Sequence, residues 1–126
     1  MSFRTLLILH VDDDAEMRDL IALCLATAED MTLTSLDSGP AALEHLKAAA
    51  PPHLILLDVC MPEMDGPATL AALRGLDGLA ETPVVFLTGR AAEHECARYR
   101  ALGAADVIAK PFDPARLADD IRRHAA

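Results

Sequence analysis

Residues 6–14 read Leu-Leu-Ile-Leu-His-Val-Asp-Asp-Asp, so an apolar run passes directly into acidic residues. Residues 54–58 repeat this pattern as Leu-Ile-Leu-Leu-Asp. Apolar runs of this length predict parallel strands that are buried on both faces of a sheet. Ligands of an open parallel sheet bind beyond the carboxyl ends of its strands. If these two strands are neighbours, Asp12, Asp13 and Asp58 converge on one pocket.

Such a cluster of carboxylates predicts a bound cation. Like charges at close range repel unless a cation neutralises them or one carboxylate takes up a proton. Mg²⁺ is a hard cation that prefers oxygen ligands, so we expect Mg²⁺ at Asp12, Asp13 and Asp58. The alternative for Asp12 and Asp13 is that they cap the helix that follows, and for Asp14 we favour that role.

Strand-like and helical patterns alternate along the whole chain. The predicted strands lie at 5–11, 31–36, 53–58, 83–88 and 105–109, and the predicted helices at 14–28, 39–49, 66–74, 91–101 and 114–124. Asp113 and Pro114 predict the N-cap and the first residue of the last helix. Five strand–helix units in one short chain predict an α/β fold, a doubly wound parallel sheet with helices on both faces.

Composition limits the function further. A chain of 126 residues predicts a single domain, 1–126. Its net charge of −9 argues against a nucleic-acid-binding surface. Cys24, Cys60 and Cys96 are too widely spaced to suggest a zinc site, and an odd number argues against a disulfide framework, so we expect reduced thiols. No apolar run approaches the length of a membrane span, and we expect a cytoplasmic protein without membrane contact.

Two more predicted strands end in polar residues at the same edge. Thr88 ends the run Val-Val-Phe-Leu, and Lys110 follows the run Val-Ile-Ala. The pocket would then contain a carboxylate nucleophile, two metal-binding acids, a hydroxyl group and an ammonium group. That set meets the requirements of phosphoryl transfer to an aspartate, because a metal and cationic or polar groups must stabilise the oxygens of the transferred group.

The same segments carry a family resemblance. The chain resembles the receiver domain of bacterial response regulators over nearly its full length, in four segments that occur in order: 8–14 (ILHVDDD), 56–66 (LLDVCMPEMDG), 86–89 (FLTG) and 110–112 (KPF). The resemblance implies a flavodoxin-like fold with five strands in the order 2-1-3-4-5 and five flanking helices.

The resemblance also implies a role for each site residue. Asp58 would be the phospho-acceptor and a metal ligand. Asp13 would bind Mg²⁺ directly, Asp12 mainly through water, and Cys60 through its backbone carbonyl. The Thr88 hydroxyl and the Lys110 ammonium would contact the phosphoryl group, and the bond between Lys110 and Pro111 would be cis.

Other positions bear on how the phosphorylated state would be read out or hydrolysed. Val107, three residues before Lys110, stands where many members carry an aromatic residue that moves inward on activation, and Tyr99 cannot be assumed to replace it. Cys60 and Arg90 occupy positions that the resemblance associates with access of water to the phosphoryl group.

The histidines carry no metal-ligand spacing. We expect His10 to be packed in the core, and we expect the other histidines on the surface: His45, His53, His94 and His124.

The resulting hypothesis is a phospho-accepting receiver of a two-component system, without an effector domain and without metabolic enzyme activity. Its partners would be a histidine kinase or a histidine phosphotransfer protein, and its output would be partner binding or phosphorelay as a stand-alone regulator. One alternative is a receiver excised from a hybrid histidine kinase or a larger regulator. A distant alternative is an aspartate-nucleophile phosphohydrolase, but that class needs a second acid where this chain has Cys60.

Overall fold

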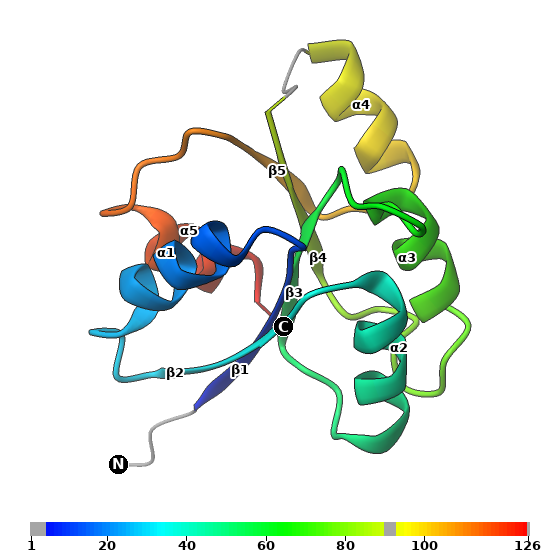
Figure 1. Ribbon diagram of the computed structural model, residues 1–126, viewed down its shortest axis with the longest axis horizontal. Coiled ribbons are helices and arrows are strands. Elements are labelled where there is room, and N and C mark those ends of the chain that lie inside the picture. Colours follow the sequence, from blue (N-terminus) through cyan, green and yellow to red (C-terminus); the bar gives the residue numbers. More distant parts are fainter. Residues whose placement is uncertain (1–4, 90–92, 126) are drawn as a thin grey trace.

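Strands and helices alternate from the first described residue to the last (Figure 1). The computed structural model describes residues 5–89 and 93–125, without the side chains of residues 93 and 94. The strands are β1 (Leu6–Val11), β2 (Met31–Leu36), β3 (Leu54–Asp58), β4 (Val84–Thr88) and β5 (Asp106–Ala109). The helices are α1 (Ala15–Leu25), α2 (Gly39–Ala48), α3 (Gly66–Leu73), α4 (Glu93–Ala101) and α5 (Leu117–His124). Every predicted element is therefore present, and residues 91 and 92 of the fourth predicted helix lie outside the described part.

The strands form one parallel sheet in the order β2-β1-β3-β4-β5. This order confirms the predicted doubly wound, flavodoxin-like topology. β3 lies at the centre of the sheet, with Leu57 paired to Val11 of β1 and Asp58 paired to Leu87 of β4. Because all strands run the same way, the residues that follow β1, β3, β4 and β5 meet at a single edge of the sheet.

Helices cover both faces of the sheet, as Figure 1 shows. α1 and α5 lie on one side, and α2, α3 and α4 lie on the other. Successive strand residues point to opposite faces, so each buried strand supplies two cores. Leu9 and Leu57 belong to the core under α2 and α3, whereas Ile8 and Leu56 belong to the core under α1 and α5.

Polar side chains fix where the helices begin. The Asp14 side chain accepts a hydrogen bond from the Glu16 backbone N–H at 3.0 Å, which confirms Asp14 as the N-cap of α1. Ser38 and Asp65 cap α2 and α3 in the same manner. A side-chain oxygen at this position satisfies a backbone N–H that has no partner within the helix.

The predicted start of the last helix is wrong by one turn. α5 begins at Leu117, and its N-cap is Arg116 rather than Asp113. Asp113 instead accepts hydrogen bonds from the Ala115 N–H through its side chain and from the Arg116 N–H through its carbonyl, each at 3.0 Å. Asp side chains stabilise such local turns as readily as they cap helices, and the sequence does not distinguish the two outcomes.

Three histidines that were predicted on the surface are partly buried. His53 Nδ1 accepts a hydrogen bond from the Leu7 N–H at 2.9 Å, and His124 Nε2 lies 2.8 Å from Asp106 Oδ2. His45 is partly buried beside β1. These rings pack under chain segments distant in sequence, which composition alone does not reveal. The His94 side chain lies outside the described part of the chain.

Candidate functional site

Three carboxylates meet beyond the carboxyl ends of β1 and β3. Asp12, Asp13 and Asp58 each offer an oxygen atom, and these atoms lie within 4.8 Å of one another. Asp12 is 0% exposed and Asp58 is 5% exposed, whereas Asp13 is open to solvent. The predicted convergence is confirmed, and the cluster has a buried floor and one accessible side.

Lys110 brings a positive charge to this cluster from the far side of β4. Its Nζ donates a hydrogen bond to Asp58 Oδ1 at 2.7 Å and lies 3.6 Å from Asp12 Oδ2. The Lys110 backbone N–H donates to the Thr88 carbonyl at 2.8 Å, and the bond between Lys110 and Pro111 is cis, as the resemblance implied. Lys110 is therefore tied to the end of β4 while its side chain reaches the end of β3.

Thr88 and Cys60 are the other two residues that the sequence predicted for the site. Thr88 is the last residue of β4, is 3% exposed and pairs with Ala109 of β5. Cys60 is exposed, two residues after Asp58. Arg90 lies outside the described residues.

Burial and charge together set the ionisation of these groups. Burial raises the pKa of Asp58, and the nearby carboxylates Asp12 and Asp13 raise it further, against the opposing effect of Lys110. Burial alone would lower the pKa of Lys110, but its bond to Asp58 and the charge of Asp12 outweigh burial and raise it. The ammonium group therefore remains charged in a pocket that holds excess negative charge.

Asp12 differs from Asp58 in the direction of its shift. Burial would raise the pKa of Asp12, but His10, the Asp14 backbone N–H and Lys110 together lower it. Its Oδ1 accepts from the Asp14 N–H at 2.9 Å. Asp12 is thus held as a carboxylate, the form that binds a cation.

This donor set suits a divalent cation. Among the described residues, Lys110 is the one ammonium group beside these three carboxylates, so negative charge remains uncompensated. Mg²⁺ binds through one or two carboxylates with water at its remaining positions. The exposed side of the cluster, at Asp13, leaves room for such water. The residues therefore fit a hydrated Mg²⁺.

Comparison with known proteins agrees with the fold and the site. Residues 8–122 match the family described as the response regulator receiver domain. The chain belongs to this family. It is a receiver domain of two-component signalling, and its acidic pocket is formed by Asp12, Asp13 and Asp58.

Curated relatives of this receiver differ in length. A protein-glutamate methylesterase/protein-glutamine glutaminase of Burkholderia thailandensis is 39% identical over 116 residues, which are 89% of this chain but 32% of that protein. The two-component response regulator ORR3 of rice is 35% identical over 107 residues, 85% of this chain and 81% of that protein. The receiver thus spans about a third of one relative and most of the other.

Solved structures share the whole architecture. The chemotaxis protein CheY4 of Vibrio cholerae superposes with a TM-score of 0.87 at 28% identity, covering 95% of this chain and 98% of that one. The Mn²⁺-bound form of the response regulator Rcp1 superposes with a TM-score of 0.73 at 29% identity, covering 94% and 88%. The Rcp1 structure is thus one with a bound divalent cation.

The loop after β3 is shaped by a glycine that packs against the backbone of Asp58 and Val59. The Gly66 N–H donates to the Val59 carbonyl at 2.8 Å. A Cβ atom at Gly66 would lie 2.7 Å from the Asp58 carbonyl oxygen and 2.8 Å from Val59 Cα. The start of α3 therefore lies directly behind the residue that ends β3.

Sequence reasoning missed two residues that contact Asp12. Arg18 Nη1 donates to the Asp12 carbonyl at 2.7 Å, and His10 Nε2 lies 3.7 Å from Asp12 Oδ2. The signal for His10 was available, because residues two apart on a strand share a face. Arg18 gave no comparable signal, since its reach depends on the direction in which α1 leaves the loop.

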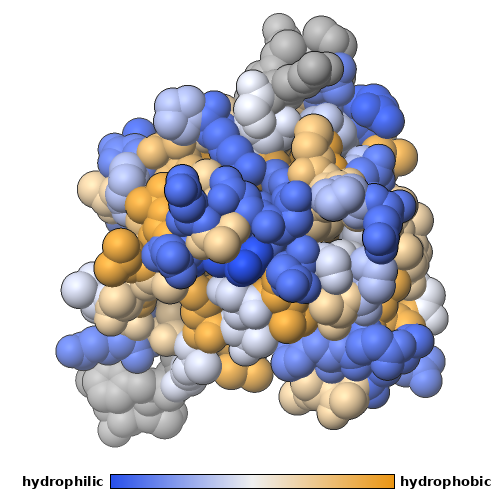
Figure 2. Space-filling view, viewed as in Figure 1, coloured by the Kyte–Doolittle hydropathy of each residue, from blue (hydrophilic) through white to orange (hydrophobic). Residues whose placement is uncertain are grey.

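The face drawn in Figure 2 is mixed in character. Hydrophilic residues gather near its middle, over the region where β1 leads into α1 in Figure 1. Apolar residues surround this patch without forming one continuous surface in this view. The polar surface over the end of β1 agrees with the position of the carboxylate cluster.

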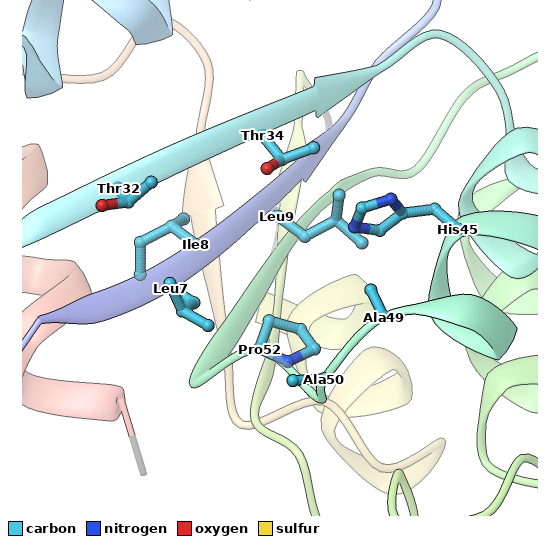
Figure 3. A pocket seen from close by; sticks show the side chains of 9 residues that line it. All are labelled: Leu7, Ile8, Leu9, Thr32, Thr34, His45, Ala49, Ala50 and Pro52. Carbon is cyan, nitrogen blue, oxygen red and sulfur yellow. The ribbon is translucent and has the colours of Figure 1, made fainter.

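A separate cavity of about 200 Å³ lies beside residues 7–9 of β1 (Figure 3). In the close-up, the side chains of Leu9, His45 and Pro52 surround the opening between β1 and α2. Its other lining residues are apolar or small, and none is acidic: Leu7, Ile8, Thr32, Thr34, Ala49 and Ala50. This cavity is separate from the acidic site of the receiver, because Asp12, Asp13 and Asp58 do not line it.

Proposed function

We propose that Asp58 accepts a phosphoryl group from a histidine kinase or a histidine phosphotransfer protein. The observation that carries this proposal is the hydrogen bond of 2.7 Å from Lys110 to a buried carboxylate at the centre of the acidic cluster. An Asp58 carboxylate oxygen attacks phosphorus, the bond from phosphorus to the histidine nitrogen breaks, and the departing imidazole keeps that electron pair. The product is an acyl phosphate on Asp58.

Asp12, Asp13, Asp58 and the carbonyl of Cys60 would hold Mg²⁺. The bound ion supplies positive charge that neutralises the carboxylates and the phosphoryl oxygens. Asp12 and Asp58 are buried, whereas Asp13 faces solvent and leaves the site open to the donor.

Lys110 and Thr88 would bind the oxygens of the transferred group. Lys110 already lies at hydrogen-bond distance from Asp58, so a small movement of its ammonium group is enough to follow the new charge. Thr88 ends β4, next to the end of β3, and its hydroxyl is the neutral donor of the set. Both groups stabilise negative charge without taking part in bond formation.

The receiver would act by changing the partners it binds or by passing the phosphoryl group to a histidine, and we propose no metabolic enzyme activity for it. Its place of action would be the cytoplasm. Within the described residues, no helix is long and apolar enough to cross a membrane.

A stand-alone regulator is the first form of the proposal. The second is a receiver that works within a longer protein, and the chain matches about a third of the length of the relative from Burkholderia thailandensis. A neighbouring gene for a kinase or a chemotaxis cluster would distinguish the two forms.

A phosphodonor assay tests the acceptor. Acetyl phosphate should add one phosphoryl group in the presence of Mg²⁺ and none in the presence of a chelator, as measured by intact mass. Asp58→Asn should abolish the addition, and Asp77→Asn, which changes an exposed acid remote from the cluster, should leave it intact. Retention of the modification in Asp58→Asn would falsify the assignment.

A further inference from the structure

A fully buried histidine lies directly beneath the acidic site. His10 is on β1, two residues before Asp12, and both residues are 0% exposed. Neither ring nitrogen of His10 has a hydrogen-bond partner, and neither has Asp12 Oδ2. Among the residues that the structure describes, these are the only buried side-chain nitrogen or oxygen atoms left unpaired. Buried polar groups almost always have partners, so this group of atoms needs an explanation.

Two of the three unpaired atoms, His10 Nε2 and Asp12 Oδ2, lie close to each other. His10 Nε2 lies 3.7 Å from Asp12 Oδ2, which is too long for a hydrogen bond. The rest of Asp12 is already held, because Oδ1 accepts from the Asp14 N–H and the carbonyl accepts from Arg18. Lys110 Nζ is 3.6 Å from Oδ2 and donates instead to Asp58. Oδ2 therefore has donors nearby on two sides and a hydrogen bond from neither.

We propose that His10 is a positioning residue for the metal site. The His10 Nε2–H donates to Asp12 Oδ2 when Mg²⁺ occupies the acidic cluster. A shift of about 1 Å brings the two atoms to hydrogen-bond distance. Carboxylates that bind a metal are themselves held by hydrogen bonds from outer groups, and His10 supplies that bond for Asp12. This inference rests on the Mg²⁺ site proposed above.

The buried position of His10 suits a residue that orients Asp12 and excludes direct contact of its ring with the phosphodonor. Its ring faces the core that α1 and α5 cover, because Ile8, two residues earlier on the same strand, belongs to that core. The buried residues of that core are apolar, and the Asp12 carboxylate is the acceptor shown near Nε2. A ring with 0% exposure does not compete with water or substrate at the open side of the cluster.

Nitrogen NMR of the unmodified protein tests the tautomer. With ¹⁵N-labelled histidine, the His10 ring should carry its hydrogen on Nε2 in the Mg²⁺-loaded protein, and its Nε2 shift should change as Mg²⁺ is added. His53 accepts from the Leu7 N–H near the start of β1, and His45 lies on α2 beside the cavity at Leu9, so both serve as internal controls whose shifts should stay constant. A hydrogen on Nδ1 in the loaded protein, or an Nε2 shift indifferent to Mg²⁺, would overturn the proposal.

Calorimetric Mg²⁺ titrations of variants, without any phosphodonor, test the contribution to binding. His10→Phe keeps the ring shape and removes the donor, and it should weaken Mg²⁺ binding about 10- to 100-fold, the usual effect of losing an outer-shell partner. His10→Gln keeps an N–H donor and should bind Mg²⁺ more tightly than His10→Phe. His45→Phe, remote from the cluster, should bind as the parent does.

The outcomes separate this inference from the proposed function. Mg²⁺ binding that is equal in His10→Phe and the parent, or equally weakened in His10→Phe and His10→Gln, overturns the role of His10 alone. A parent protein that binds no Mg²⁺ overturns the metal site and this inference together. If His10→Phe does not fold, the tautomer measurement on the unmodified protein decides.

Discussion

Lys110 Nζ lies 2.7 Å from Asp58 Oδ1, a hydrogen bond between residues 52 positions apart in the sequence. Asp58 ends β3 and Lys110 follows β5, with β4 between them, so the contact crosses the carboxyl end of β4. The same ammonium group lies 3.6 Å from Asp12. One cation thus offsets part of the charge of two buried carboxylates, and this shortage of positive charge determines the behaviour of the metal-free site.

Asp58 should make the metal-free protein less stable as the pH rises. Folding raises the pKa of this carboxyl group above its ordinary value of 3.8, chiefly through burial. A group that holds its proton more tightly in the folded state stabilises the fold at low pH, and this contribution is lost as the pH rises through the folded pKa. Asp58→Asn does not ionise and should therefore be more stable than the parent at neutral pH with a chelator present.

The measurement is the free energy of unfolding in urea, for parent and variant, at several pH values between 3 and 8. Other carboxyl groups, such as Asp106 with its lowered pKa, contribute the opposite slope, but they are common to both proteins and cancel in the difference. If the free energies of unfolding of parent and Asp58→Asn differ by the same amount at every pH in this range, the prediction is wrong.

Mg²⁺ should raise the melting temperature of the parent. A ligand that binds only the folded state stabilises it, by about 2.7 kcal/mol when its concentration is 100 times the dissociation constant. Asp13→Asn should remove most of this effect, and because Asp13 is exposed the substitution leaves the core unchanged. Asp19→Asn, an exposed acid on α1, is the control. A melting temperature of the parent that does not change with millimolar Mg²⁺ would count against the metal site.

Gly66→Ala should destabilise the protein by about 1–3 kcal/mol, the usual range for forcing a group into filled space. The new Cβ would lie 2.7 Å from the Asp58 carbonyl oxygen, and backbone atoms cannot rotate away as a side chain can. Gly75→Ala is the matched control, because its nearest atom would be 3.5 Å away. Urea unfolding compares the two variants. Equal stability would show that α3 shifts at little cost.

Activation should perturb the residues near Asp58 and Thr88 more than those near β5. Val107 is too small to exchange much apolar area between surface and core, and it is already partly buried in the core under α4. Tyr99 is 4% exposed, with its ring packed edge-on against Phe86 at a centroid distance of 5.2 Å. An aromatic ring therefore occupies this core before any phosphorylation.

Amide NMR shifts with and without beryllofluoride measure this response. The largest shifts should follow Asp58 and Thr88, and Asp58→Asn should show none. Shifts around Tyr99 as large as those beside Asp58 would show instead that its ring moves on activation.

Short-range patterns in the sequence identified the elements of this fold. The apolar runs before Asp12, Asp58 and Thr88 mark buried strands, because a strand covered on both faces has no position for an exposed polar side chain. Asp14 was recognised as a cap because a cap needs only a residue and the N–H two positions later. The last helix shows the limit of such signals, since Asp113 is equally suited to a turn and its actual role depends on where α5 packs.

The sequence by itself therefore determined the alternation of strands and helices, and it placed the acids, Thr88 and Lys110 at strand ends. Only the tertiary structure decided that Asp12 is buried while its neighbour Asp13 is exposed, and that Lys110 bonds to Asp58 rather than to Asp12. It also placed the unpaired ring of His10 beneath Asp12. The physical reason is range: backbone preference and periodicity act over a few residues, whereas burial and charge pairing depend on which distant segments the sheet brings together.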